Sequence, residues 1–247
     1  MTEPTTAGDR PSVLVPIEVL EGETLPEGVP ELLANAHVVL LGYHVLPEQT
    51  APGQARMQFE ERAKRKLTEF EDRLEAAGAT VERHLVFTHS EQKTLDRKLD
   101  EYDCLAVLVP NACEPPEDVL VAIRGTVGVD RITRVVAGLF AGSDVTVTLY
   151  HGMLEDETRA DAKTFLEGVS DRLGRLGFPE TAVAYSIDEE EGDVDRIVEL
   201  AEEHDAVVMG ETDPSVATFV FGMPSRQVAK RFLGPVIVVR REHDDRD

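Results

Sequence analysis

The sequence predicts an α/β fold made of two tandem doubly wound parallel-sheet units. Three observations lead to this fold class: short β-branched runs alternate with longer amphipathic stretches, the runs are apolar throughout, and the pattern restarts near mid-chain. Strands that are apolar on both faces and alternate with helices are typical of parallel sheets covered on both sides. We expect one unit over residues 12–116 and a second over residues 117–241.

The first unit is expected to contain four strands and two helices. The predicted strands are Ser12–Glu18, His37–Leu46, Val81–Phe87 and Cys104–Val109. Arg56–Ala77 predicts a long helix that ends at Gly78, because its apolar residues recur at helical spacing. The stripe consists of Met57, Phe59, Ala63, Leu67, Phe70 and Leu74. A shorter helix over Ser90–Leu99 is expected to use Ser90 as its N-cap.

The second unit repeats this order and then continues. The run DVLVAI at Asp118–Ile123 resembles SVLVPI at Ser12–Ile17, which indicates an internal duplication. Its other predicted elements are the strands Val145–His151, Ala182–Ile187 and Ala206–Met209 and the helices Asp156–Leu176 and Asp193–Glu203. Only this unit goes on to a loop, a helix at Ser225–Phe232 and a last strand at Pro235–Arg240. The first unit is therefore shortened at its C-terminal end.

The net charge of the chain limits the classes of partner that it can bind. The 247 residues include 48 acidic and 25 basic side chains, and the formal net charge is -23. Nucleic acid and anionic membrane surfaces are disfavoured, because both are bound through clustered cations. Only 6 of the basic residues are lysine and tryptophan is absent. One interpretation is a halophilic, acidic surface suited to molar salt, which screens self-repulsion. The alternative is an ordinary acidic soluble protein.

The chain is expected to be cytoplasmic, without membrane insertion. Its two cysteines exclude a disulfide scaffold and indicate a reducing compartment; Cys104 lies in an apolar strand and Cys113 in a connector. Met1–Arg10 is polar and lacks the apolar run of a signal peptide. The most apolar long stretch, Val135–Leu154, contains the turn signal AGSD. It predicts the end of a helix, a turn and a buried strand rather than a membrane span.

The loop after Met209 is the best candidate site. Ligands of open parallel sheets bind beyond the carboxyl ends of the strands, and a glycine loop that leads into a helix offers N–H groups to a phosphate. The suitable residues are Gly210, Thr212, Gly222, Ser225 and Arg226. Asp213 in the same loop would repel a phosphate. A loop with Ser225 as a helix cap is the alternative that needs no ligand.

Two histidines end matching strands. His44 and His151 each follow a tyrosine, Tyr43 in the first unit and Tyr150 in the second. Such histidines either face a ligand crevice or form structural hydrogen bonds.

The C-terminal part resembles the signature of the universal stress protein family. The resemblance rests on VVMG at Val207–Gly210, a loop with a glycine, a helix, and PVIVVR at Pro235–Arg240. DVLVAIRG and the strand that ends in Tyr-His are similar to the first two strands of that family. The resemblance implies an adenine nucleotide alpha hydrolase-like sandwich in each unit, in a tandem form like that of a haloarchaeal member. It also implies a regulatory or binding role in stress response rather than a dedicated enzyme.

The phosphate loop departs from that of the ATP-binding members, which carry Gly-x2-Gly-x9-Gly-Ser/Thr. Gly210 matches the first glycine, Asp213 replaces the second, and Gly222 comes one residue early. The family aspartate after the first strand is Arg124 here, next to Ile123. Arg124 could pair with a phosphate or neutralise nearby carboxylates. The resemblance leaves open ATP or AMP binding and a degenerate loop that binds nothing. The residues of the nucleotide site would be Ile123, Arg124, Gly210, Thr212, Asp213, Gly222, Ser225 and Arg226.

Two other functions stay open. A slow Mg-dependent ATPase or nucleotide transferase would use Glu211 and Asp213 as metal ligands, although no nucleophile signature or metal-ligand spacing occurs. A ligand-free scaffold for a protein partner is the third possibility. Because family dimers often pair through their last strands, the resemblance also implies a homodimer joined at Pro235–Arg240.

Overall fold

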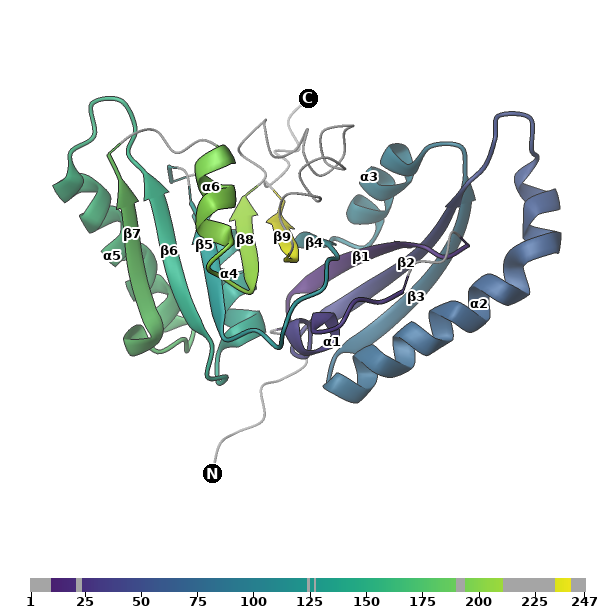
Figure 1. Ribbon diagram of the computed structural model, residues 1–247, viewed down its shortest axis with the longest axis horizontal. Coiled ribbons are helices and arrows are strands. Elements are labelled where there is room, and N and C mark those ends of the chain that lie inside the picture. The colour runs from purple at the N-terminus through teal and green to yellow at the C-terminus, as the bar shows by residue number, and fades with distance from the viewer. Residues whose placement is uncertain are drawn as a thin grey trace.

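The strands of the protein form one nine-stranded sheet in a computed structural model that describes residues 10–20, 24–123, 125–126, 128–189, 194–210 and 234–240. The strand bounds are β1 (Ser12–Glu18), β2 (His37–Val45), β3 (Thr80–Thr88), β4 (Ala106–Val109), β5 (Asp118–Ala122), β6 (Thr146–Gly152), β7 (Val183–Asp188), β8 (Ala206–Gly210) and β9 (Val236–Val239). Their order is β3-β2-β1-β4-β9-β8-β5-β6-β7 (Figure 1). All neighbouring strands are parallel except β4 and β9.

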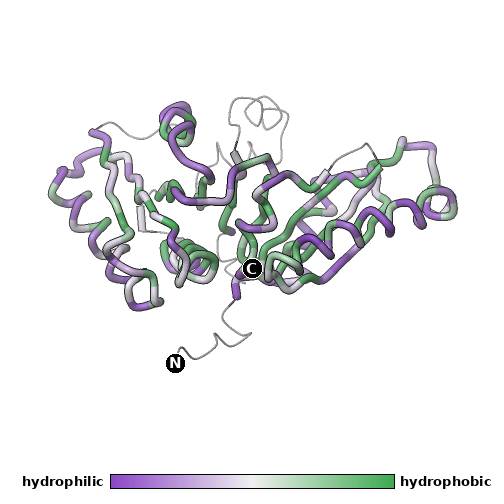
Figure 2. Tube along the Cα trace, turned by 60° about the horizontal axis from the view of Figure 1, so that its bottom comes forward, coloured by the Kyte–Doolittle hydropathy of each residue, from purple (hydrophilic) through white to green (hydrophobic). Residues whose placement is uncertain are grey.

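Helices cover both faces of the sheet, as the fold-class prediction requires. The helices are α1 (Val29–Leu32), α2 (Pro52–Ala77), α3 (Glu91–Glu101), α4 (Val129–Phe140), α5 (Arg159–Arg175) and α6 (Val194–Ala201), with a 3-10 turn at Glu180–Ala182. One core packs the sheet against α1, α2, α4 and α5, and a second packs its other face against α3 and α6. Figure 2 shows the hydrophobic residues gathered in the strands and the hydrophilic residues on the outer helices. The predicted α/β architecture is confirmed.

Several local predictions are confirmed by the backbone. The Ser90 hydroxyl accepts a hydrogen bond from the N–H of Lys93 and caps α3. Gly78 ends α2 with φ 116°, a conformation that favours glycine. The stretch Val135–Leu154 consists of the end of α4, a turn, and β6 with the residues after it. Among the described residues, every helix is either too short or too polar to span a bilayer.

The apolar stripe of α2 differs from the prediction at its start. Met57 is 90% exposed, whereas Ala55 is buried and Phe59 packs against buried neighbours. Residues two positions apart on a helix point in nearly opposite directions. Because the stripe runs through Ala55, Phe59 and Ala63, Met57 must face solvent.

The last strand lies inside the sheet. β9 is parallel to β8, with Val236 beside Val207, and antiparallel to β4, with Val239 beside Ala106. The expectation that this strand is free to join two chains is therefore wrong. The reason is that β4 is followed at once by the connector to β5, so its outer edge has no partner from nearby in the sequence. β9 fills that edge from within the same chain.

We call β3, β2, β1 and β4 the first strand set, and the other five strands the second strand set. Side-chain contacts reinforce the β4–β9 pair between them. The amide of Asn35 donates to the carbonyl of Leu139 at 2.9 Å, and that of Asn111 donates to the carbonyl of Gly234 at 3.1 Å. The Arg240 guanidinium donates to Asp100 at 2.7 Å. The first core is continuous across the joint, so the two strand sets share one interior.

Candidate functional site

The carboxyl ends of β5, β6 and β8 meet at one edge of the sheet. Ala122 of β5 lies beside Tyr150 of β6 and Met209 of β8 in the parallel register. Two predicted site residues therefore lie at the same edge: Ile123 directly follows β5, and Gly210 is the last residue of β8. Ile123 is 3% exposed. The arrowheads of β6, β7 and β8 all point to the top of Figure 1, where this edge lies.

The other predicted site residues lie outside the described part of the chain. They are Arg124, Thr212, Asp213, Gly222, Ser225 and Arg226, together with the candidate magnesium ligand Glu211. Among the described residues, no group of three His, Cys, Asp or Glu side chains is arranged to hold a metal ion.

His151, at the end of β6, joins the strand ends to the following segment. Its Nδ1 lies 2.9 Å from the carbonyl oxygen of Ile123, and its Nε2 lies 2.9 Å from Oε2 of Glu157. The ring packs against Phe165 of α5 at 5.1 Å between centroids. Of the two interpretations of this histidine, the hydrogen-bonded one is correct. Its second partner, Glu157, was not predicted, because nothing in a loop sequence indicates which strand end a carboxylate will reach.

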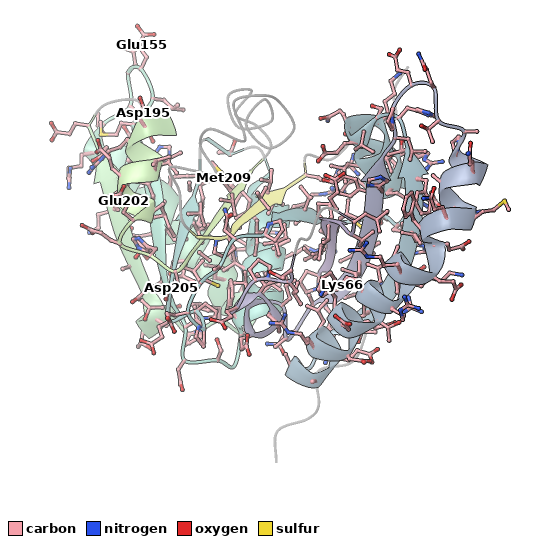
Figure 3. All side chains as sticks on the ribbon, turned by 45° about the vertical axis from the view of Figure 1, so that its right-hand side comes forward. Lys66, Glu155, Asp195, Glu202, Asp205 and Met209 are labelled. Atoms are coloured by element: carbon pink, nitrogen blue, oxygen red, sulfur yellow. The ribbon has the colours of Figure 1, made fainter. Side chains whose placement is uncertain are left out.

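A second polar cluster lies on the opposite face of the same strand ends. The Asp188 carboxylate accepts hydrogen bonds from Arg196 Nε at 2.7 Å and from the Tyr150 hydroxyl at 3.2 Å. The Arg196 guanidinium lowers the pKa of Asp188, and the Tyr150 hydroxyl adds to this effect. Asp188 is the last residue of β7, one position beyond the strand predicted over Ala182–Ile187, and it fixes α6 to the sheet. Figure 3 shows other acidic side chains nearby: Asp195 on α6, Glu202 just after α6, and Glu155 on the loop beyond β6.

The first strand set repeats this arrangement with different chemistry. The Tyr43 hydroxyl donates to Glu91 at 2.8 Å, as Tyr150 donates to Asp188. At the end of β1, Glu18 is 8% exposed, and its Oε1 lies 3.7 Å from Nδ1 of His44. A buried carboxylate here is unfavourable for a phosphate ligand.

A cavity of about 360 Å³ lies away from this edge, beside the starts of β5 and β6. Its lining residues are Pro116, Glu117, Asp118, Ser143, Asp144, Val145 and Thr146. Three of them are acidic, so the cavity is unsuited to an anionic ligand.

Comparison with solved structures identifies the fold. A universal stress protein from Archaeoglobus fulgidus DSM 4304 matches 95% of this chain and 97% of its own, with a TM-score of 0.63 and 18% sequence identity. The fold is that of the universal stress proteins. A putative universal stress protein from Pseudomonas aeruginosa UCBPP-PA14 matches 94% of each chain at 17% identity, with a TM-score of 0.47. No protein-family model and no curated protein matches the sequence.

Smaller universal stress proteins match part of the chain. One from Archaeoglobus fulgidus, solved in complex with dAMP, has 22% identity and covers 49% of this chain and 96% of its own, with a TM-score of 0.38. At these identities the likeness concerns the fold. In this fold, the carboxyl ends of β5 and β8 lie side by side.

Proposed function

We propose that this protein is a tandem, cytoplasmic universal stress protein with a non-enzymatic regulatory role, and that it binds an adenine nucleotide. The observation that carries the proposal is the adjacency of the β5 and β8 ends, with Ala122 beside Met209. Open parallel sheets bind ligands at such strand ends. The universal-stress-protein fold and the family-like loop that begins at Gly210 support the same edge.

The proposed ligand is ATP or AMP. Arg124 would pair with phosphate oxygens, Gly210 and Gly222 would let the backbone approach them, and Ser225 would donate its hydroxyl. The other residues proposed for the site are Ile123, Thr212, Asp213 and Arg226. The carboxylate of Asp213 works against a phosphate, so the affinity should be lower than that of a loop with glycine there.

The acidic surface sets the conditions for any test. With a net charge of -23, the chain repels an anionic ligand in dilute buffer. Molar KCl shortens the screening length to roughly 3 Å and removes most of this repulsion. We propose a high-salt cytoplasm as the setting, so binding should be measured in molar KCl.

The deciding experiment is mass analysis of small molecules that co-purify with the folded protein, followed by calorimetric titration with ATP and AMP. A bound adenine nucleotide supports the proposal, and Arg124→Ala should then weaken binding about tenfold. Arg65→Ala is the matched control, because Arg65 is an exposed arginine on α2. An empty preparation together with flat titrations would reject nucleotide binding and favour a ligand-free scaffold. Magnesium-dependent turnover that is lost in Asp213→Ala would favour an ATPase instead.

A further inference from the structure

Two hydrogen-bond acceptors flank the buried ring of His151. One is the carbonyl oxygen of Ile123 at Nδ1, and the other is the carboxylate of Glu157 at Nε2, each at 2.9 Å. The side chain is 1% exposed, so water does not replace either partner. A neutral imidazole carries a single N–H and can donate to only one acceptor. Both bonds form together when the ring is an imidazolium and the carboxyl group is ionised.

The surroundings of Glu157 favour its ionised form. Partial burial by itself raises the pKa of this group, but hydrogen bonds from the backbone N–H of Leu154 and from His151 outweigh it, and the pKa is lowered. The Leu154 N–H donates to the same Oε2 atom at 2.9 Å. Oε2 thus accepts from the Leu154 N–H and faces the ring nitrogen at the same time, a geometry that suits a carboxylate opposite an N–H of the ring.

Among the residues that the structure describes, the elements around the ring offer few other charges. The ring of Phe165 on α5 packs against His151. Asp161, in the first turn of α5, repels the Glu157 carboxylate and is hydrogen-bonded to Thr158. From β7 comes Asp188, whose carboxylate bonds Tyr150 and Arg196 on the opposite face of the sheet. Within the described part of β5 and its end, the group that contacts the ring is an uncharged carbonyl.

We infer that His151 and Glu157 form a pH-dependent clasp that holds the carboxyl end of β5 against the segment between β6 and α5. The clasp ties three points of the chain together: Ile123 at the end of β5, His151 on β6, and Glu157 just before the capping box of α5. When the pH rises until the ring loses its second proton, one of the two bonds is lost and the segment loosens. The clasp itself does not require a ligand, but an effect on nucleotide affinity rests on the proposed function.

The first strand set supplies an internal contrast. His44 is the last residue but one of β2, as His151 is of β6, and its ring also contacts aromatic side chains, Phe59 and Phe87. Among the described residues its Nδ1 has no hydrogen-bond partner, and Oε1 of Glu18 lies 3.7 Å away, beyond hydrogen-bond distance. His44 therefore lacks the clasp geometry, and His44→Gln serves as the matched control.

The test uses the full chain labelled with ¹⁵N, studied by NMR in molar KCl across the pH range in which it stays folded. The ring nitrogen shifts of His151, assigned by their loss in His151→Gln, report whether the ring is an imidazolium. The exchange rate of the Leu154 amide hydrogen, corrected for its intrinsic pH dependence, reports whether the segment is held. Glu157→Gln is the decisive variant, because a carboxamide oxygen in the Oε2 position still accepts from Leu154 but carries no charge, so protonation of the ring no longer adds a charge-assisted bond there.

We expect the corrected exchange of Leu154 to rise about tenfold as the ring becomes neutral, since a charge-assisted bond is lost. The same exchange should be independent of ring protonation in Glu157→Gln, and His44→Gln should behave like the wild type. A ring that is neutral while Leu154 stays protected would overturn the clasp, as would an equal rise in Glu157→Gln. If nucleotide binds, its affinity should fall with the same pH profile. If nothing binds, the proposed function fails, whereas the NMR measurements still decide the clasp.

Discussion

Val239 of β9 lies opposite Ala106 of β4 in an antiparallel pair, although the two residues belong to different strand sets. This pairing closes the sheet within one chain and makes the two strand sets share an apolar core. Both edges of β9 are used, so association of two chains would have to involve another surface.

The pairing of β9 with β4 should be essential for stability. Ile237 is fully buried in β9, so Ile237→Ala should lower the free energy of unfolding by about 2–5 kcal/mol. Denaturant titration in molar KCl, followed by circular dichroism, measures this change. Met57→Ala is the control and should change it by less than about 0.5 kcal/mol, because Met57 is 90% exposed. Two well-separated unfolding transitions in the wild type would contradict a shared core.

Gly28 should tolerate no side chain. Its φ is 77°, and a Cβ atom there would lie 2.2 Å from the carbonyl oxygen of Cys113 in the connector. Gly142 has a φ of 83° but open space around it, so Gly142→Ala measures the backbone strain alone, roughly 1 kcal/mol. Gly28→Ala should cost clearly more in thermal or chemical denaturation. Equal costs would show that the connector moves aside without penalty.

The two cysteines should be slow to react in the folded protein. Burial raises the pKa of each thiol to about 11, so little thiolate exists at neutral pH. Cys104 is 1% exposed, whereas Cys113 is partly exposed. Mass spectrometry after iodoacetamide treatment at pH 8 should find Cys113 modified first, and both modified rapidly in denaturant. Faster labelling of Cys104 would contradict the burial described here.

The Asp188–Arg196 pair should make the α6 attachment sensitive to acid. The folded-state pKa of Asp188 is depressed, mainly by the Arg196 guanidinium. Its contribution to stability is therefore present above the unfolded pKa, about 3.9, and is lost as the pH falls through the folded value. Asp188→Asn should be less stable than the wild type at pH 7, and the difference should shrink below about pH 4. A difference that is constant with pH would exclude ionic stabilisation.

Much of the fold follows from sequence patterns that act locally. The predicted start of one helix at Ser90 and the predicted end of another at Gly78 are set by hydrogen bonds and backbone angles within a few residues. The strands are recognisable because both of their faces are buried. Met57 was predicted to lie on the buried stripe but faces solvent. Apolar residues two positions apart, such as Met57 and Phe59, cannot both lie on one face of a helix.

The features that sequence analysis missed depend on contacts between distant residues. The pairing of β9 with β4 follows from an unfilled edge elsewhere in the chain. The contact between His151 and Glu157 depends on how the loop before α5 folds back. For the candidate site, the parallel register brings the ends of β5 and β8 together, and the roles of Ile123 and Gly210 stay predictions. The roles of the remaining loop residues stay predictions.

The position of β9 also has a consequence for synthesis of the protein. β4 leaves the ribosome long before β9, since all of β5 to β8 is translated between them. During that interval its outer edge exposes unpaired backbone groups, which are prone to pair with other chains. A nascent chain can therefore assemble the first strand set early, but it completes the sheet only when β9 emerges.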